Sequence, residues 1–252
     1  MTPWVLRLLV ANVLMFFVQY TAPGATSLLV FYPSEVLVHP WTLVTYMFLH
    51  GGFGHIFFNM LALYFFGPPV EQRLGGNRFI TLYMISGIVG ALFSIVLGFP
   101  IVGASGAIMG VSLAFAKFWP RQQVLIWGVL PIEARWLVVI YAAWDILGAS
   151  GYGPRGIANL AHLGGLAGAL LYLLYLDRRQ GARRFKAAAT PKVSDSSLGA
   201  WQKVDRNSIH AVNRDEVDRI LDKINASGIA SLTPQERQFL SNFVPPDDRK
   251  PA

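Results

Sequence analysis

Six apolar stretches, separated by breaks rich in glycine, proline or charge, constrain this chain more than any other feature. They lie near residues 4–20, 54–67, 77–98, 105–119, 132–149 and 156–176. Hydrophobic residues make up 54% of the chain, charged residues only 14%, and the mean hydropathy is +0.44. This composition is typical of a membrane protein rather than a soluble domain. We therefore expect an all-α membrane protein built as a six-helix transmembrane bundle.

The basic residues predict how the bundle lies in the membrane. Connectors 67–78, 117–135 and 177–186 hold ten Lys and Arg residues in all, whereas connectors 21–53, 99–104 and 150–155 hold only Arg155. The positive-inside rule then places both termini in the cytoplasm. We expect a multi-pass protein of the plasma (inner) membrane. A signal-peptide core is the alternative for the first stretch, disfavoured by its length and polar residues.

The C-terminal quarter of the chain differs from the rest. We expect a membrane domain over 1–176, a basic and polar linker over 177–200 and a small cytoplasmic helical tail over 201–252. Helical spacing of apolar residues predicts a first tail helix that ends at Gly228. Thr233, Pro234 and Glu236 read as a capping box that starts a second helix, with Phe239, Leu240 and Phe243 available to cover the first.

Polar side chains inside the apolar stretches are informative, because a buried polar group in hydrocarbon costs free energy unless it is paired. They occur in HGGFGHIFFN (50–59), GASGAIMG (103–110) and ANLAHLGGLAG (158–168), and at Asp145. The chain has no cysteine, which excludes thiolate nucleophiles and disulfides. We expect no cofactor, and no metal site, because no tight cluster of His and carboxylate residues occurs.

The fourth stretch is too short to cross the membrane. The 14 residues from Ser105 to Phe118 make about 21 Å of helix, against a hydrocarbon core of about 30 Å. Trp119-Pro120 marks its cytoplasmic end, so the preceding loop is expected to dip inward and carry Ser105 below the outer surface. If the sixth stretch starts near Gly156, His162 lies at a similar depth.

Glycine patterns suggest how Ser105 and His162 could meet. Gly106 and Gly110 are four residues apart on the fourth stretch, and Gly164 and Gly168 on the sixth. Small residues at this spacing let two helix backbones approach closely, which favours a hydrogen bond across the contact. Packing alone would also explain the pattern, but the matched depth favours a nucleophile and its base. The glycines predicted to pack near this site are Gly103, Gly106, Gly110, Gly164, Gly165 and Gly168.

The other polar groups receive supporting roles or none. His55 and Asn59 share a helix face and, with the N-terminus of the fourth helix, form a plausible oxyanion hole; mutual hydrogen bonding is the alternative. Asp145 is interpreted as an outer-end polar group, so a dyad is preferred to a triad. His50 is expected to fasten the outer loop to the second stretch, while His39 and His210 are interpreted as ordinary loop and tail residues.

Together these motifs resemble the rhomboid family of intramembrane serine proteases, with HGGFGHIFFN, GASG and AHLGGLAG in order on the second, fourth and sixth stretches. The resemblance covers about residues 1–176. It implies a six-helix fold with Ser105 as nucleophile, His162 as base, and His55, Asn59 and the Ser105 N–H as the oxyanion hole. One departure is Trp41-Thr42, where many rhomboids carry Trp-Arg, so the anchoring of the first outer loop is expected to differ. Pro68 and Pro69 are expected to kink or end the second helix before Glu71.

The expected partners are transmembrane protein substrates, cut near the outer face of the membrane, and membrane lipids. We expect no nucleic acid, and nothing in the sequence identifies a partner for the tail. A proteolytically inactive chaperone or scaffold that binds client helices is the main alternative. A solute transporter is disfavoured because no inverted repeat is visible.

Overall fold

The computed structural model describes residues 1–126, 128–152, 159–189 and 211–241. The chain divides into two compact units, Met1–Asp177 and Arg178–Ala252. Helices dominate both units. The expected start of the sixth stretch near Gly156, the polar segment 191–199, His210 and Phe243 lie outside the described residues.

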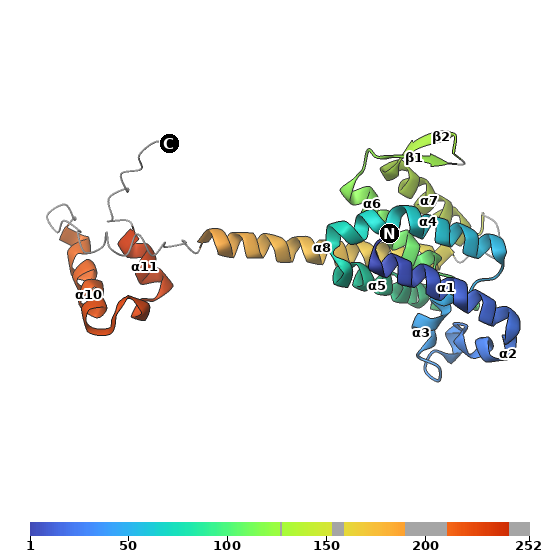
Figure 1. Ribbon diagram of the computed structural model, residues 1–252, viewed down its shortest axis with the longest axis horizontal. Helices are drawn as coiled ribbons and strands as arrows, with labels where there is room; N and C mark the ends of the chain where they lie inside the picture. Colours follow the sequence, from blue (N-terminus) through green and yellow to red (C-terminus); the bar gives the residue numbers. More distant parts are fainter. Residues whose placement is uncertain (127, 153–158, 190–210, 242–252) are drawn as a thin grey trace. The chain divides into compact units, whose positions relative to one another are not determined.

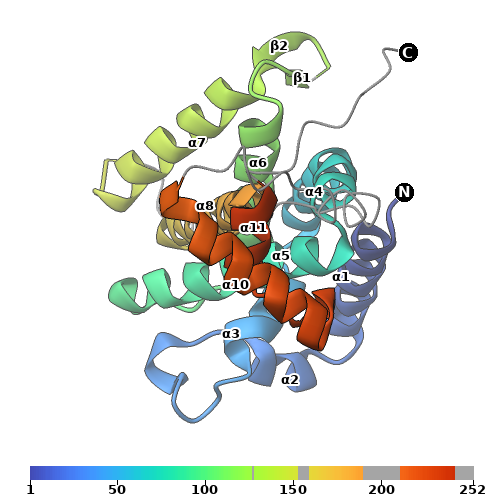
Figure 2. The ribbon, with the colours of Figure 1, turned by 90° about the vertical axis from the view of Figure 1, so that its left-hand side faces the viewer.

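Within the described residues, six helices of at least 14 residues lie in the first unit or begin there (Figures 1 and 2). They are α1 (Pro3–Thr21), α4 (Phe53–Leu74), α5 (Gly76–Ser94), α6 (Ser105–Phe118), α7 (Ala134–Ala149) and α8 (Asn159–Ala189). Four helical segments, Pro3–Thr21, Phe53–Leu74, Gly76–Ser94 and Asn159–Arg179, are long and apolar enough to cross a membrane. The predicted all-α membrane fold is confirmed. Because α8 continues to Ala189, the first part of the expected linker is helical.

Short elements complete the first unit. The first outer connector contains α2 (Pro23–Thr26), η1 (Ser27–Leu29), η2 (Pro33–Glu35), α3 (Thr42–Thr45) and η3 (Tyr46–Phe48), and η4 (Ile95–Leu97) follows α5. Between α6 and α7, β1 (Gln123–Ile126) pairs antiparallel with β2 (Leu130–Glu133). The connector between these two helices is therefore a small hairpin.

The second helix does not end at its prolines. α4 continues through Pro68 and Pro69 to Leu74, so of the two expected effects of these prolines, a kink or an end, the end does not occur. Proline removes a backbone donor but leaves the following turn able to form. Here Val70 and Glu71 are buried, and the Glu71 carboxylate is hydrogen bonded to the start of α1. These tertiary contacts hold the last turn of the helix.

Helix α6 lies at the centre of the bundle. It contacts α4, α5 and α7, and nine of its 14 residues are buried. Figure 2 shows α1 and α7 on opposite sides of it. The helix starts at Ser105 and ends at Phe118, as predicted. Lys117 near its end pairs with Asp177 of α8.

The loop before α6 is held by the first outer connector. Ile101 and Phe31 exchange two backbone hydrogen bonds of 3.0 and 3.3 Å, and Gly103 N–H donates to the Tyr46 carbonyl at 2.9 Å. Gly103 and Ala104 are buried. Irregular backbone within a membrane must be shielded by protein, and these contacts supply the shielding that the short fourth helix required.

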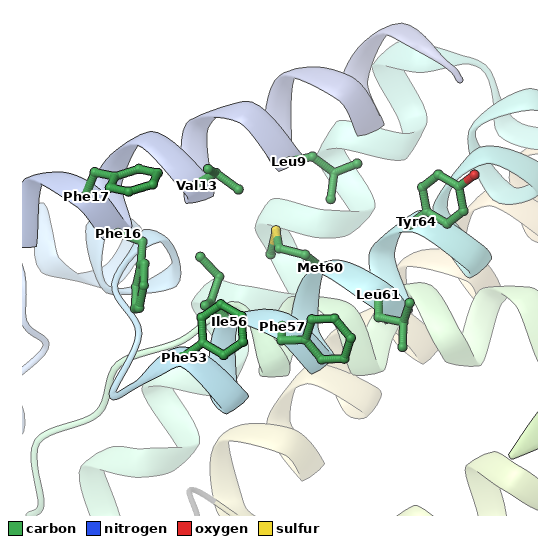
Figure 3. Close-up of a pocket in the computed structure, with 10 residues that line it drawn as sticks. All are labelled: Leu9, Val13, Phe16, Phe17, Phe53, Ile56, Phe57, Met60, Leu61 and Tyr64. Atoms are coloured by element: carbon green, nitrogen blue, oxygen red, sulfur yellow. The ribbon is translucent and has the colours of Figure 1, made fainter. Parts of the chain in front are cut away.

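An apolar pocket of about 480 Å³ lies between α1 and α4. Figure 3 shows the side chains that line it, from Leu9 and Phe17 on α1 to Phe53 and Tyr64 on α4. Ligand and catalytic sites usually add a few convergent polar groups to such a lining. Only the Tyr64 hydroxyl is polar among the side chains drawn, so this pocket is not a candidate reaction site.

The second unit contains a small helical module. α10 (Ala211–Ser227), η7 (Ile229–Ser231) and α11 (Pro234–Ser241) enclose the buried residues Val217, Ile220, Leu232 and Leu240. The predicted helix end is confirmed: Gly228 has φ 75° and donates to the Ile224 carbonyl at 2.8 Å. The capping box is also confirmed, since Glu236 N–H donates to Thr233 Oγ1 at 3.2 Å and Thr233 N–H to Glu236 Oε2 at 2.8 Å.

Candidate active site

Ser105 is the first residue of α6. Gly103, two residues earlier, has φ 123°, a region that side chains other than glycine rarely adopt. This conformation turns the loop into the helix and leaves Ser105 at the helix N-terminus. The first N–H groups of a helix have no carbonyl one turn earlier to bond. The Ser105 hydroxyl therefore lies beside the first backbone N–H groups of α6.

His162 of α8 meets Ser105 directly. Its Nε2 lies 2.8 Å from Ser105 Oγ, across 57 residues of sequence. The His162 side chain is 18% exposed, so the pair lies below the surface but within reach of water. The predicted contact between these two residues is present, with hydrogen-bond geometry that suits proton transfer.

The other ring nitrogen of His162 also has a partner, which the sequence prediction missed. Nδ1 lies 3.0 Å from Oδ1 of Asp145 on α7, and the same oxygen accepts a hydrogen bond of 2.9 Å from Asn159 Nδ2. The sequence interpretation of Asp145 only as an outer-end polar group included no contact with His162, which the structure shows. An isolated Asp in the fifth apolar stretch was the available signal, but its partner depends on how α7 packs beside α8.

His55 of α4 lies beside Gly103, in the loop that carries Ser105. Gly51 N–H donates to His55 Nδ1 at 3.3 Å, which makes Nδ1 an acceptor and leaves Nε2 to carry the proton in the neutral ring. A Cβ placed on Gly103 would lie 2.7 Å from this Nε2. The proton-bearing nitrogen of His55 therefore lies against the loop that carries Ser105, and only glycine fits between them.

Asn59 lies one turn after His55 on the same helix. It is buried, and within the described residues its Nδ2 has no hydrogen-bond acceptor. The nitrogen lies 3.8 Å from the position of a Cβ on Gly103. A buried donor without an acceptor requires an explanation. The alternative that His55 and Asn59 satisfy each other leaves this donor unexplained.

The predicted glycines all lie at close approaches, but they do not all face the same helix. A Cβ on Gly165 would lie 2.0 Å from the Gly106 carbonyl oxygen, so these two glycines bring α8 against α6. Gly164 and Gly168 instead face Val89 and Ile85 of α5, and Gly110 faces Ser86 of α5 and Ala169 of α8. The close contact between α6 and α8 thus comes from Gly165, not from the Gly164/Gly168 pair.

The remaining histidines lie outside the Ser105–His162 contact. His50 is buried, its backbone exchanges hydrogen bonds with the Gln19 side chain, and its ring lies edge-on to His55. Its backbone thus fastens the outer loop to α1, and its ring contacts α4 through His55. His39 pairs with Glu35 in the loop. Across the described ranges, no group of three or more His, Asp or Glu residues has the geometry to hold a metal ion.

This arrangement can be compared with known proteins. The rhomboid domain pattern matches residues 38–179, more than half of the chain. The chain belongs to the rhomboid family. It is 36% identical over 156 residues to rhomboid protein 1, mitochondrial, of Saccharomyces cerevisiae, and 35% identical over 131 residues to rhomboid protease GluP of Bacillus subtilis. It is 34% identical over 154 residues to rhomboid protease GlpG of Serratia proteamaculans.

These matches cover part of each protein. They span 56%, 51% and 59% of this rhomboid, and 44%, 24% and 52% of the yeast, Bacillus and Serratia proteins respectively. Family membership and the apolar helices make this rhomboid an integral multi-pass membrane protein. The tail matches a separate family of unknown function, DUF6576, over residues 205–243.

The first outer connector of this rhomboid shows its own anchoring. Trp41 Nε1 donates to the Leu28 carbonyl at 2.9 Å, and the hydroxyl of buried Thr42 donates to the His39 carbonyl at 2.6 Å. Thr45 Oγ1 adds a hydrogen bond of 2.9 Å to the Leu29 carbonyl. Two threonine hydroxyls and the Trp41 indole therefore hold the connector, and Thr42 stands at the position where the resemblance led us to expect arginine.

Proposed function

We propose that this rhomboid is an intramembrane serine endopeptidase that hydrolyses peptide bonds of transmembrane protein substrates. The observation that carries the proposal is the hydrogen bond of 2.8 Å between Ser105 Oγ and His162 Nε2. A serine alcohol is a weak nucleophile unless an adjacent base accepts its proton. Relatives named as rhomboid proteases support the same reaction class.

In the acylation step, Ser105 Oγ attacks the carbonyl carbon of the scissile bond while His162 Nε2 accepts the hydroxyl proton. The C–N bond then breaks, and His162 delivers this proton to the leaving amine. The product is an ester between Ser105 and the N-terminal fragment of the substrate. Water, which reaches the partly exposed pair, attacks the ester with His162 again as the base, and the serine is restored.

The negative oxygen of the tetrahedral intermediate needs donors. His55 Nε2, Asn59 Nδ2 and the Ser105 N–H are the proposed set, because each is a donor near the Gly103–Ser105 turn. The N-terminus of α6 adds the positive end of its helix dipole. Pre-oriented donors of this kind contribute about 3 kcal/mol each to transition-state stabilisation.

The proposed arrangement in the membrane follows the distribution of basic residues. Both termini face the cytoplasm of a plasma (inner) membrane, and the site opens to the outer side. Residues 1–176 act as the protease, 177–200 connect, and 201–252 form the tail. Because a helical substrate has its carbonyls hydrogen bonded, the scissile segment must unwind locally before attack.

The test uses purified full-length protein in liposomes with a single-span substrate. Ser105→Ala and His162→Ala are each expected to abolish cleavage, and Ser105→Ala to abolish labelling by a fluorophosphonate. Ser112→Ala is the matched control, because Ser112 is the other serine on α6 and is buried. Full cleavage by Ser105→Ala would refute the proposal. Client binding by every variant, with no cleavage by the wild type, would indicate the chaperone alternative.

A further inference from the structure

We propose that Asp145 is a positioning residue for His162, so that Ser105, His162 and Asp145 act as a triad. The inference rests on the proposed proteolytic function and adds a residue to it. It begins from the contact of 3.0 Å between Asp145 Oδ1 and His162 Nδ1. This contact joins α7 to α8 and lies on the opposite side of the imidazole ring from Ser105.

The contact determines which nitrogen of His162 carries the proton. A carboxylate only accepts hydrogen bonds, so the neutral ring donates from Nδ1 to Asp145. Nε2 is then deprotonated and presents its lone pair to Ser105 Oγ at 2.8 Å. A base in this tautomer can accept the serine proton without first exchanging its own.

A second contact holds Asp145 itself. Asn159 lies three residues before His162, so both side chains project from the same face of α8. Its Nδ2 donates to Asp145 Oδ1 at 2.9 Å. A Cβ on Gly148 of α7 would lie 2.5 Å from this nitrogen, so the glycine one turn after Asp145 provides the space for the Asn159 side chain.

The burial of Asp145 suggests what its charge is for. The residue is 3% exposed, and a carboxylate removed from water costs several kcal/mol unless a cation or hydrogen bonds compensate. Among the described residues, His162 is the group that forms an ion pair with it. The charge of His162 appears when it takes the proton of Ser105, so the carboxylate stabilises the imidazolium at that step.

The experiment compares steady-state cleavage by wild-type protein, Asp145→Asn and Asp177→Asn in liposomes. Asp177→Asn is the matched control. It also neutralises a carboxylate, but Asp177 lies on α8 and pairs with Lys117 of α6. In Asp145→Asn, kcat is expected to fall by about 100-fold while KM is unchanged.

The outcomes separate this inference from the function on which it rests. If wild-type protein cleaves no substrate, the proposed function fails. If wild type cleaves and Asp145→Asn matches it in kcat, the triad fails. A merely structural role would raise KM or reduce the amount of folded protein along with kcat, and this result would also overturn the inference. If Asp145→Asn does not fold, Asn159→Ala carries the test: kcat is expected to fall with KM unchanged, and a wild-type kcat would overturn the triad.

Discussion

The carboxylate of Glu71 accepts a hydrogen bond of 3.0 Å from the backbone N–H of Val5, across 66 residues of sequence. Its other oxygen accepts one of the same length from Trp4 N–H. Glu71 is buried near the end of α4 and supplies acceptors to the first turn of α1, where helix N–H groups lack partners. One side chain thus joins the first two membrane helices.

Neutralising this carboxylate is expected to loosen the contact between α1 and α4. Glu71→Gln loses the charge at a helix N-terminus and one acceptor, which corresponds to a decrease of about 1–2 kcal/mol in the free energy of unfolding. The measurement is denaturant-induced unfolding in detergent. Glu133→Gln is the control, because Glu133 belongs to a partly exposed pair with Arg135. Equal midpoints for the two variants would contradict the prediction.

Adding a methyl group at Gly165 is expected to abolish the proposed proteolytic activity. The new Cβ would lie 2.0 Å from the Gly106 carbonyl oxygen, so α8 must move away from α6. A displacement of about 1 Å at the reacting groups costs about 100-fold in rate. Cleavage by Gly165→Ala should therefore fall by at least that factor. Gly54→Ala is the control, because nothing lies within 4 Å of its Cβ position, and similar rates for both variants would count against this packing.

His50 is expected to make stability depend on pH. Burial and, to a lesser extent, the charge of nearby His55 lower the pKa of His50 from 6.5 to about 4. The unfolded chain therefore binds this proton first as the pH falls. The stabilisation is complete above pH 6.5, decreases between pH 6.5 and 4, and amounts to about 3 kcal/mol.

The measurement compares unfolding midpoints at pH 7 and pH 4.5 in detergent. His50→Gln cannot titrate and should lose distinctly less stability over this range than the wild type. His39→Gln, which alters a histidine outside the buried cluster, should follow the wild type. A His50→Gln profile parallel to the wild-type one would show that the ring is accessible to protons in the folded state.

Glu236 is expected to control the stability of the tail module. Hydrogen bonds from Lys223, the Thr233 N–H and Arg219 lower the pKa of Glu236 from 4.5 to about 2. Its stabilising effect is therefore present above pH 4.5 and lost as the pH falls towards 2. Glu236→Gln should speed amide hydrogen exchange across α10 and α11 at pH 7. Glu216→Gln, which removes one pair with Arg219, should have the smaller effect, and the reverse order would contradict the prediction.

Much of this protein could be predicted from local patterns. The extent of α6, the depth argument for Ser105 and the Thr233–Glu236 capping box depend on residues close together in the sequence. The pairing of Ser105 with His162 could also be inferred from helix length, although the glycine pair expected to bring α8 against α6 was the wrong one. The roles of His55 and Asn59 stay a prediction, although the unpaired Asn59 Nδ2 now favours them.

Other features depended on contacts between helices. The sequence by itself determined which segments are apolar helices and which polar residues lie inside them, because the cost of exposing backbone and charge to hydrocarbon acts on each segment separately. The tertiary structure alone decided that Glu71 would hold α4 together past its prolines and that Gly165, not Gly164, would meet α6. It also decided that Asp145 would reach His162. Each of these depends on the rotation of one helix about its axis relative to another, which helical periodicity leaves open.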